Sequence, residues 1–128
     1  MSTSQTYASA GVDIDAGERF TQMIKERVHA AWPDEAYEIG GFAGGGSIPN
    51  GVKTFQAGVD GTGTKIILAA ILGRFDGIGR DAVAMAAVDA YVSGVQPAAI
   101  LDVIDVAKLN PDKHIRIIDS IIAGCRYA

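Results

Sequence analysis

The chain has little of what several protein classes require. A single cysteine, Cys125, among 128 residues excludes an internal disulfide framework and fits a reducing compartment. The longest apolar run, residues 66–72, is far too short to span a bilayer. The net charge is −4, and the scattered lysines and arginines do not form the basic face that nucleic acid needs. The first ten residues lack the basic and apolar segments of a secretory signal. We therefore expect a cytoplasmic protein that binds neither membrane nor nucleic acid.

Length and composition indicate one domain that associates with another chain. The 128 residues suffice for a single domain with a real core, and we expect a flexible tail over residues 1–10 and the domain over residues 11–128. The chain has 16 glycines among its 128 residues, well above the average glycine content of ~7% in proteins. This excess indicates that particular backbone conformations are important in this protein. The mean hydropathy of +0.20 indicates more apolar surface than one small domain hides. A homodimer follows as an expectation.

The spacing of apolar residues predicts helices and strands in an α+β order. Helices are expected over about 16–32, 64–72, 77–94 and from 111 onward, the first with Asp15 and Glu18 as a capping box and the last with Asn110 as its cap. Short strands are expected over 11–15, 52–59 and 97–107. We expect a mixed sheet with helices on one face.

The most informative stretch runs from residue 58 to residue 65. It reads Gly58-Val59-Asp60-Gly61-Thr62-Gly63-Thr64-Lys65. Gly61 and Gly63 let the backbone approach phosphate oxygens, and Lys65 adds a cation at the start of a helix. Asp60 makes sense if Mg²⁺ lies between it and a phosphate. The stretch therefore indicates a metal-bridged nucleotide site. Because the order differs from a P-loop, an ordinary turn with an exposed lysine stays the alternative.

Two acids on the second long helix are further candidates. Asp81 and Asp89 are eight residues apart, which leaves them about 80° apart around a helix axis, so they can share one side. Asp89 lies in a nearly uncharged stretch, where burial without a partner such as a metal would be costly. An exposed acid on a half-solvated helix is an equally weighted alternative.

Cys125 is a weak candidate for a nucleophile. Only His29 and His114 could activate its thiol as a base, and both are expected on helix surfaces. We therefore assign no catalytic residue.

Four ordered motifs carry a resemblance that covers residues 7 to 125. They are Gly11-Val12-Asp13-Ile14-Asp15-Ala16-Gly17, Gly40-Gly41-Phe42, Asp60-Gly61-Thr62-Gly63-Thr64-Lys65, and Ile78-Gly79-Arg80-Asp81-Ala82-Val83-Ala84-Met85. Together they resemble the N-terminal domain of the aminoimidazole ribonucleotide synthetase family, also called phosphoribosylformylglycinamidine cyclo-ligases. The resemblance implies ATP-dependent ring closure of formylglycinamidine ribonucleotide to aminoimidazole ribonucleotide in purine biosynthesis, by way of phosphoryl transfer.

The resemblance also implies a site and an assembly. Sheets of two subunits would pair into a barrel-like homodimer, with ATP at the interface and Mg²⁺ on Asp60 and Asp89. The implied cofactor-binding residues are Gly40, Gly41, Asp60, Gly61, Thr62, Gly63, Thr64, Lys65, Asp81 and Asp89.

Two departures from the family bear on activity. Val88 stands where the family usually has Asn, and the chain stops before the family's Gly-Gly-Glu-Thr segment and its C-terminal domain. We therefore expect the chain alone to lack ring-closing activity, with a separate C-terminal domain as a partner. The alternatives are a non-catalytic dimerising interaction domain and a related ATP-dependent small-molecule kinase.

Overall fold

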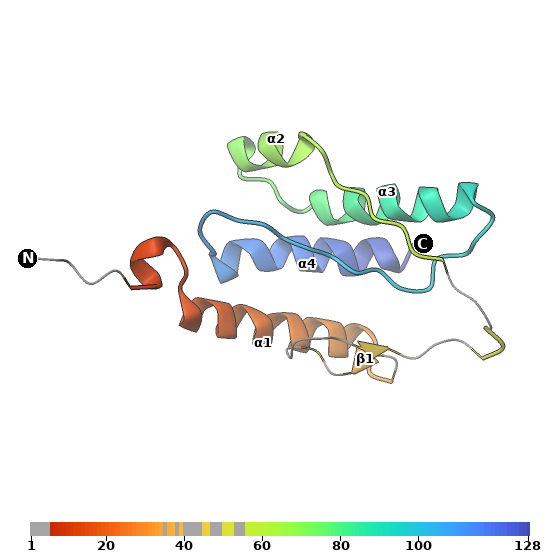
Figure 1. Ribbon diagram of the computed structural model, residues 1–128, viewed down its shortest axis with the longest axis horizontal. Helices are drawn as coiled ribbons and strands as arrows, with labels where there is room; N and C mark the ends of the chain where they lie inside the picture. Colours follow the sequence, from red (N-terminus) through yellow and green to blue (C-terminus); the bar gives the residue numbers. More distant parts are fainter. Residues whose placement is uncertain (1–5, 35, 38, 40–44, 47–49, 53–55) are drawn as a thin grey trace, which may run out of the picture.

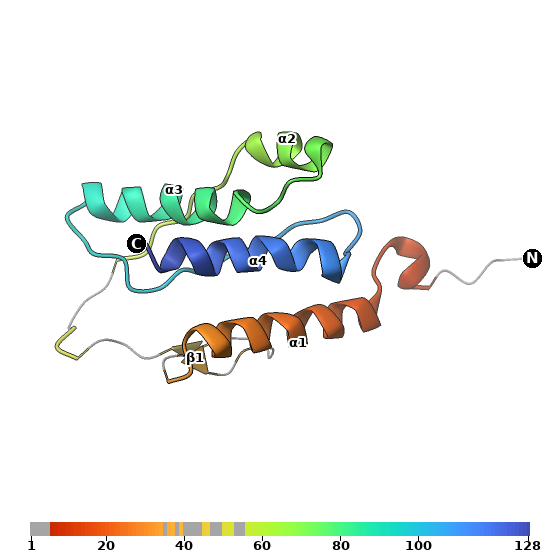
Figure 2. The same cartoon turned by 180° about the vertical axis from the view of Figure 1, so that it is seen from behind.

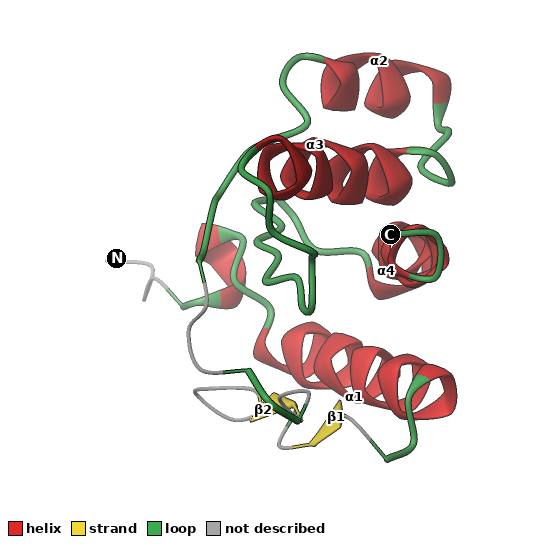
Figure 3. Ribbon diagram, turned by 90° about the vertical axis from the view of Figure 1, so that its right-hand side faces the viewer, coloured by secondary structure: helices red, strands yellow, loops and turns green. Residues whose placement is uncertain are grey.

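A computed structural model describes residues 6–34, 36, 37, 39, 45, 46, 50–52 and 56–128. Four α-helices dominate these residues: α1 (Ile14–Ala31), α2 (Lys65–Leu72), α3 (Ile78–Val92) and α4 (Pro111–Cys125). A 3-10 turn, η1 (Ala8–Ala10), precedes α1. Strands β1 (Ala36–Tyr37) and β2 (Gly45–Gly46) form a short antiparallel pair with Ala36 opposite Gly46. The helices lie side by side in the spatial order α2, α3, α4, α1 (Figure 3).

The predicted mixed sheet and barrel-like pairing of sheets are wrong. Among the described residues the only hydrogen-bonded strands are the two-residue β1 and β2. Residues 97–107, expected as a strand, run irregularly alongside α4 in both views (Figures 1 and 2). The predicted edge strand over 11–15 leads into α1 instead, and part of the predicted strand over 52–59 lies outside the described residues. An apolar run adopts strand geometry only with a hydrogen-bonding neighbour, and in the described part of the chain no strand pairs with residues 97–107.

Capping groups explain where the helices begin and end. The Asp13 carboxylate accepts a hydrogen bond from the Ala16 N–H at 3.0 Å, so α1 begins two residues before the predicted start and Asp15 is not its cap. The helix ends at Ala31, just before Pro33, which confirms the predicted stop. The Asn110 side chain accepts from the Lys113 N–H at 3.1 Å, which confirms the predicted cap of α4.

The core lies where α3 packs on α4. Its buried residues are Ala69, Phe75, Ile78, Val83, Ile115, Ile117, Ile118 and Ile121. Gly79 of α3 faces the α4 backbone so closely that a Cβ there would collide with the carbonyl oxygen of Ile117 and the amide nitrogen of Ile121. A Cβ on Gly124 of α4 would come within 3.0 Å of the Val83 side chain of α3. Two glycines, one on each helix, therefore permit the short separation of the helix axes.

Polar contacts fix the register of this seam and attach α1. The Ser120 hydroxyl of α4 donates to the Asp76 carbonyl and accepts from the Arg80 N–H, which closes the start of α3 onto α4. The Arg116 guanidinium forms a bidentate ion pair with the Asp76 carboxylate and lowers the pKa of that carboxyl. On the other side of α4, ion pairs join Arg19 to Asp112 and Arg27 to Asp119.

His114 is buried, contrary to the expectation that it lies on a helix surface. Its side chain is 7% exposed, and its Nδ1 accepts from the Asn110 N–H at 3.3 Å. The imidazole ring of His114 meets the Phe75 ring edge to face. The Lys113 ammonium lies over the Phe75 ring, 4.7 Å from its centre. Burial, and secondly the positive charge of Lys113, lower the pKa of His114.

The close approach of α3 and α4 predicts that Gly79→Ala destabilises the fold. The added methyl meets main-chain atoms of α4, which cannot rotate away, so the helices must separate at a cost of about 1–3 kcal/mol or more. Gly17→Ala in α1 is the matched control, because a Cβ there meets nothing within 4 Å and gains about 1 kcal/mol of helix propensity. Urea unfolding of both variants measures the difference. Equal stability of Gly79→Ala and the wild type would contradict the packing.

The lowered pKa of His114 predicts a loss of stability in mild acid. The unfolded chain takes up the proton near pH 6.5 and the folded chain only at lower pH, so the free energy of unfolding falls as the pH drops below about 6.5. His114→Gln should flatten this part of the pH profile, while His29→Gln should leave it unchanged. Urea midpoints between pH 7.5 and 5 test both variants. A profile that is the same in the wild type and His114→Gln would contradict the assignment.

Candidate nucleotide site along α3

The segment from residue 56 to residue 64 leads into α2 without regular structure. The Asp60 carboxylate accepts a hydrogen bond from the Gly61 N–H at 2.7 Å. Gly63 has a φ of +60°, a left-handed conformation that a residue with a side chain rarely adopts. Thr64 stands at the N-cap of α2, yet its hydroxyl makes no capping bond. The predicted turn and the helix that follows it are therefore both present.

This segment meets α3 at two places. At its end, the Lys65 ammonium lies 3.3 Å from a carboxylate oxygen of Asp81, in the first turn of α3. At its beginning, residues 56–58 and α3 enclose a small pocket of about 130 Å³ that includes Asp89. The pocket is lined by Gln56, Ala57, Gly58, Ala86, Asp89, Ala90, Ser93 and Val95. The segment thus runs antiparallel to α3, past the side that carries both acids.

The two contacts bring the predicted site residues onto one flank of the protein. Eight residues of helix separate Asp81 from Asp89, which is about 12 Å along the axis. The loop of residues 59–64 joins the two contacts, so it must pass along this length of α3. Asp60 lies two residues after Gly58, which lines the Asp89 pocket. The structure therefore places the loop beside α3, with Lys65 at Asp81 and residues 56–58 at the Asp89 pocket.

The exposure of Asp89 corrects one argument for a metal. Its side chain is exposed at the pocket, so the carboxylate has no burial cost that a metal would have to offset. Among the described residues, no three His, Cys, Asp or Glu side chains gather as a metal cluster. Two carboxylates still fit Mg²⁺, which commonly takes one or two protein carboxylates, phosphate oxygens and several waters.

Gly40 and Gly41, expected to surround the phosphates, lie outside the described residues. Ser93 is a pocket residue that the sequence analysis missed. Its hydroxyl donates to the Asp89 carbonyl at 2.9 Å, one helical turn back. The i, i+4 spacing from Asp89 is the signal that could have identified it.

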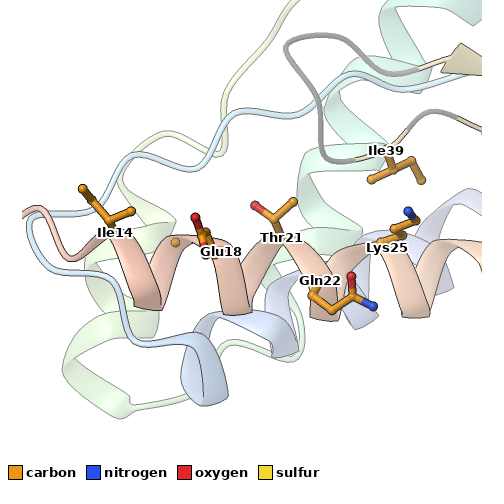
Figure 4. A pocket seen from close by; sticks show the side chains of 7 residues that line it. Ile14, Glu18, Thr21, Gln22, Lys25 and Ile39 are labelled. Atoms are coloured by element: carbon orange, nitrogen blue, oxygen red, sulfur yellow. The ribbon is translucent and has the colours of Figure 1, made fainter.

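A larger hollow of about 450 Å³ lies along the outer side of α1 (Figure 4). It is lined by Ile14, Gly17, Glu18, Thr21, Gln22, Lys25 and Ile39. None of the predicted site residues that the structure describes lines this hollow, and Gly40 and Gly41 lie outside the described residues. Its size alone does not make it the better candidate, because its described lining residues do not include the loop 58–64 or Lys65.

Cys125 does not have the surroundings of a nucleophile. Its side chain packs against the core between α3 and α4. Burial, and secondly the charge of Asp102, raise the pKa of the thiol, which disfavours the reactive thiolate. This agrees with the low weight that the sequence gave it.

Comparison with known proteins identifies similar sequences. The family described as "AIR synthase related protein, N-terminal domain" matches residues 47–128. The chain is 44% identical over 128 residues to the phosphoribosylformylglycinamidine cyclo-ligase of Trichlorobacter lovleyi, and that match covers 96% of this chain and 36% of the relative. It is 45% identical over 130 residues to the protein of the same name from Citrifermentans bemidjiense, covering 98% and 37%. For the protein of that name from Geotalea uraniireducens, the identity is 44% over 134 residues, covering 100% and 38%. The chain therefore spans a little over a third of the length of these relatives.

Proposed function

The chain belongs to the family of AIR synthase related proteins, as their N-terminal domain, and from this premise we propose that it binds Mg²⁺ and ATP along residues 58–65 and α3. It would serve as the nucleotide-binding part of a phosphoribosylformylglycinamidine cyclo-ligase in the cytoplasm. The observation that supports this most is that the glycine loop meets α3 at two points, at the Asp89 pocket and at Asp81. A loop held at both ends on a helix is a suitable platform for a polyphosphate.

Each group in the loop has a role suited to phosphate. Gly61 and Gly63 have no side chain that would keep a phosphate away from the main chain, and Lys65 supplies a positive charge. The Gly61 N–H donates to the Asp60 carboxylate in this structure, so it would have to exchange that partner to bind a phosphate. The hydroxyls of Thr62 and Thr64 can donate to phosphate oxygens. Asp60 and Asp89 would hold Mg²⁺, which neutralises phosphate charge when bound.

The overall reaction that we propose is ATP-dependent ring closure of formylglycinamidine ribonucleotide. The γ-phosphoryl group of ATP moves to the formyl amide oxygen, and an internal nitrogen then attacks the activated carbon with loss of phosphate. Catalysis of this kind consists mainly of positioning and charge neutralisation. The described residues of this chain would hold the donor phosphates, and the acceptor would be held by parts that the longer relatives contain beyond this third of their length.

We also propose that two copies of the chain associate. Large apolar side chains are exposed on the irregular segments of the described chain, led by Val59 at 99%, Leu101 at 97% and Val103 at 85%. Surfaces of this kind are seldom left in water, and they commonly mark an interface. This proposal does not depend on pairing of strands.

Nucleotide binding predicts a specific response to loss of the two acids. Asp60→Asn and Asp89→Asn should each weaken binding of a non-hydrolysable ATP analogue in the presence of Mg²⁺ by about tenfold or more, because each removes a carboxylate from the cation. Without Mg²⁺ the two variants should bind at least as well as the wild type, since a repulsive charge is gone. Titration calorimetry measures both conditions.

The control is Asp34→Asn, which makes the same charge change at an exposed acid near the end of α1. Its affinity should equal that of the wild type. If both site variants retain wild-type affinity, the assignment of the acids is refuted. If the wild type binds no nucleotide but is dimeric, the alternative of a dimerising interaction domain is favoured.

Dimerisation predicts that Leu101→Asp yields monomers. The wild type should sediment as a dimer at micromolar concentration, because separate chains would each leave Leu101 almost fully in water. Gln96→Asp adds the same charge at an exposed polar position of the same segment and should stay dimeric. A wild type that is monomeric throughout the micromolar range would rule out the homodimer.

A further inference from the structure

The ion pair between Lys65 and Asp81 joins two motifs that lie 16 positions apart in the sequence. Lys65 is the first residue of α2, and Asp81 lies in the first turn of α3. The two side chains are 49% and 46% exposed. A pair in this setting contributes little to folding stability, because water and salt screen it. Its position at the end of the glycine loop suggests a role in binding instead.

The rest of α2 provides few contacts that could hold Lys65 in place. Of its eight residues only Ala69 is buried. Ile67, Leu68 and Ile71 are each more than half exposed. Ala69 attaches α2 to the core, but the described contact that orients the Lys65 ammonium itself is the one with the Asp81 carboxylate. A lysine side chain without such a partner samples many rotamers, and binding a ligand must then restrict it.

We infer that Asp81 is a positioning residue, which holds the Lys65 ammonium over the loop 60–64 where phosphates bind, and is itself no ligand of nucleotide or metal. This rests on the proposed function of the loop. The ammonium has three donors, so it can keep its bond to Asp81 while it donates to a phosphate oxygen. A direct contact between Asp81 and phosphate would bring two negative groups together.

One electrostatic effect opposes the proposed gain in affinity from ordering Lys65. The Asp81 carboxylate also repels a bound phosphate, and its removal would relieve that repulsion. The Lys65 ammonium would lie between the carboxylate and the phosphate, so its positive charge offsets much of this repulsion. The entropy cost of ordering the lysine side chain, in contrast, falls on the ligand in full once the carboxylate is gone. Removal of the carboxylate should therefore weaken binding.

The experiment is a double-mutant cycle. Affinity for a non-hydrolysable ATP analogue with Mg²⁺ is measured at about 0.15 M salt in the wild type, Asp81→Asn, Lys65→Gln and the double variant. Asp81→Asn should weaken binding about 2- to 10-fold, the effect of freeing one long side chain. In the Lys65→Gln background the same change should not weaken binding, because no ammonium remains to be positioned and only the relief of repulsion is left. Asp81→Glu should restore most of the affinity.

The matched control is Asp112→Asn. Asp112 also lies in the first turn of a helix and pairs with an arginine of another element, but it is on α4, away from the loop. Its loss should leave the affinity unchanged. Thermal unfolding of all variants separates binding from stability, and Asp81→Asn should unfold close to the wild type.

Three results would overturn the inference. Unchanged or tighter binding by Asp81→Asn would show that the carboxylate does not position the lysine. An equal loss in the Lys65→Gln background would show that Asp81 acts on the ligand independently. Absence of nucleotide binding by the wild type would reject the proposed function, and the inference with it, and this failure is recognised without any variant.

Discussion

The contact between α3 and α4 at two glycines is the constraint on which the remaining structure depends. Gly79 and Gly124 let the backbone of each helix approach the other, and Ser120 bridges the start of α3 to α4. This contact opposes sliding of the two helices, because the main chain of α3 at Gly79 faces the main chain of α4, and the Val83 side chain fills the space beside Gly124. The α3 helix is therefore the rigid element of the protein. Two of the three candidate acids, Asp81 and Asp89, stand on it.

A site built in this way divides its parts between a rigid and an adaptable element. The acids Asp81 and Asp89 are held by α3, whereas the groups that we propose to contact phosphate belong to a loop that has little packing of its own. Loops carried by rigid elements commonly bear function, since they can come close to a ligand without disturbing the core. The exposed apolar residues of α2 indicate that this region gains further contacts in a larger assembly.

The sequence predicted the elements that depend on local signals. Asn110 and Pro111 predict the start of α4, and Gly73 ends α2 with a φ of +64°. The cap of α1 was assigned to the wrong acid because Asp13 and Asp15 are both suitable acceptors, and only the geometry decides between them. The strands were wrong because a strand requires partners from distant parts of a chain, which apolar alternation does not reveal. His114 was misplaced for the same reason, since Phe75 reaches it from a different element.

Prediction of the candidate site followed the same division. The loop 58–65 was visible as a run of glycines and hydroxyls, and the helix after it as an apolar run. The partnership of Lys65 with Asp81 was not visible, because no local rule relates positions 16 apart. The burial argument for Asp89 failed because an uncharged neighbourhood in sequence does not mean a buried one in space.

The exposure of the Lys65–Asp81 pair has a consequence for ligand binding. A buried pair would lose several kcal/mol if one partner turned toward a ligand, because the other would be left charged in a poorly solvated place. A half-exposed pair contributes only about 0–1 kcal/mol, and water replaces whatever contact is lost. The proposed phosphate ligand would therefore share the Lys65 ammonium with Asp81 without cost to the fold. The α3–α4 seam supplies the stability that makes such a weakly held lysine tolerable.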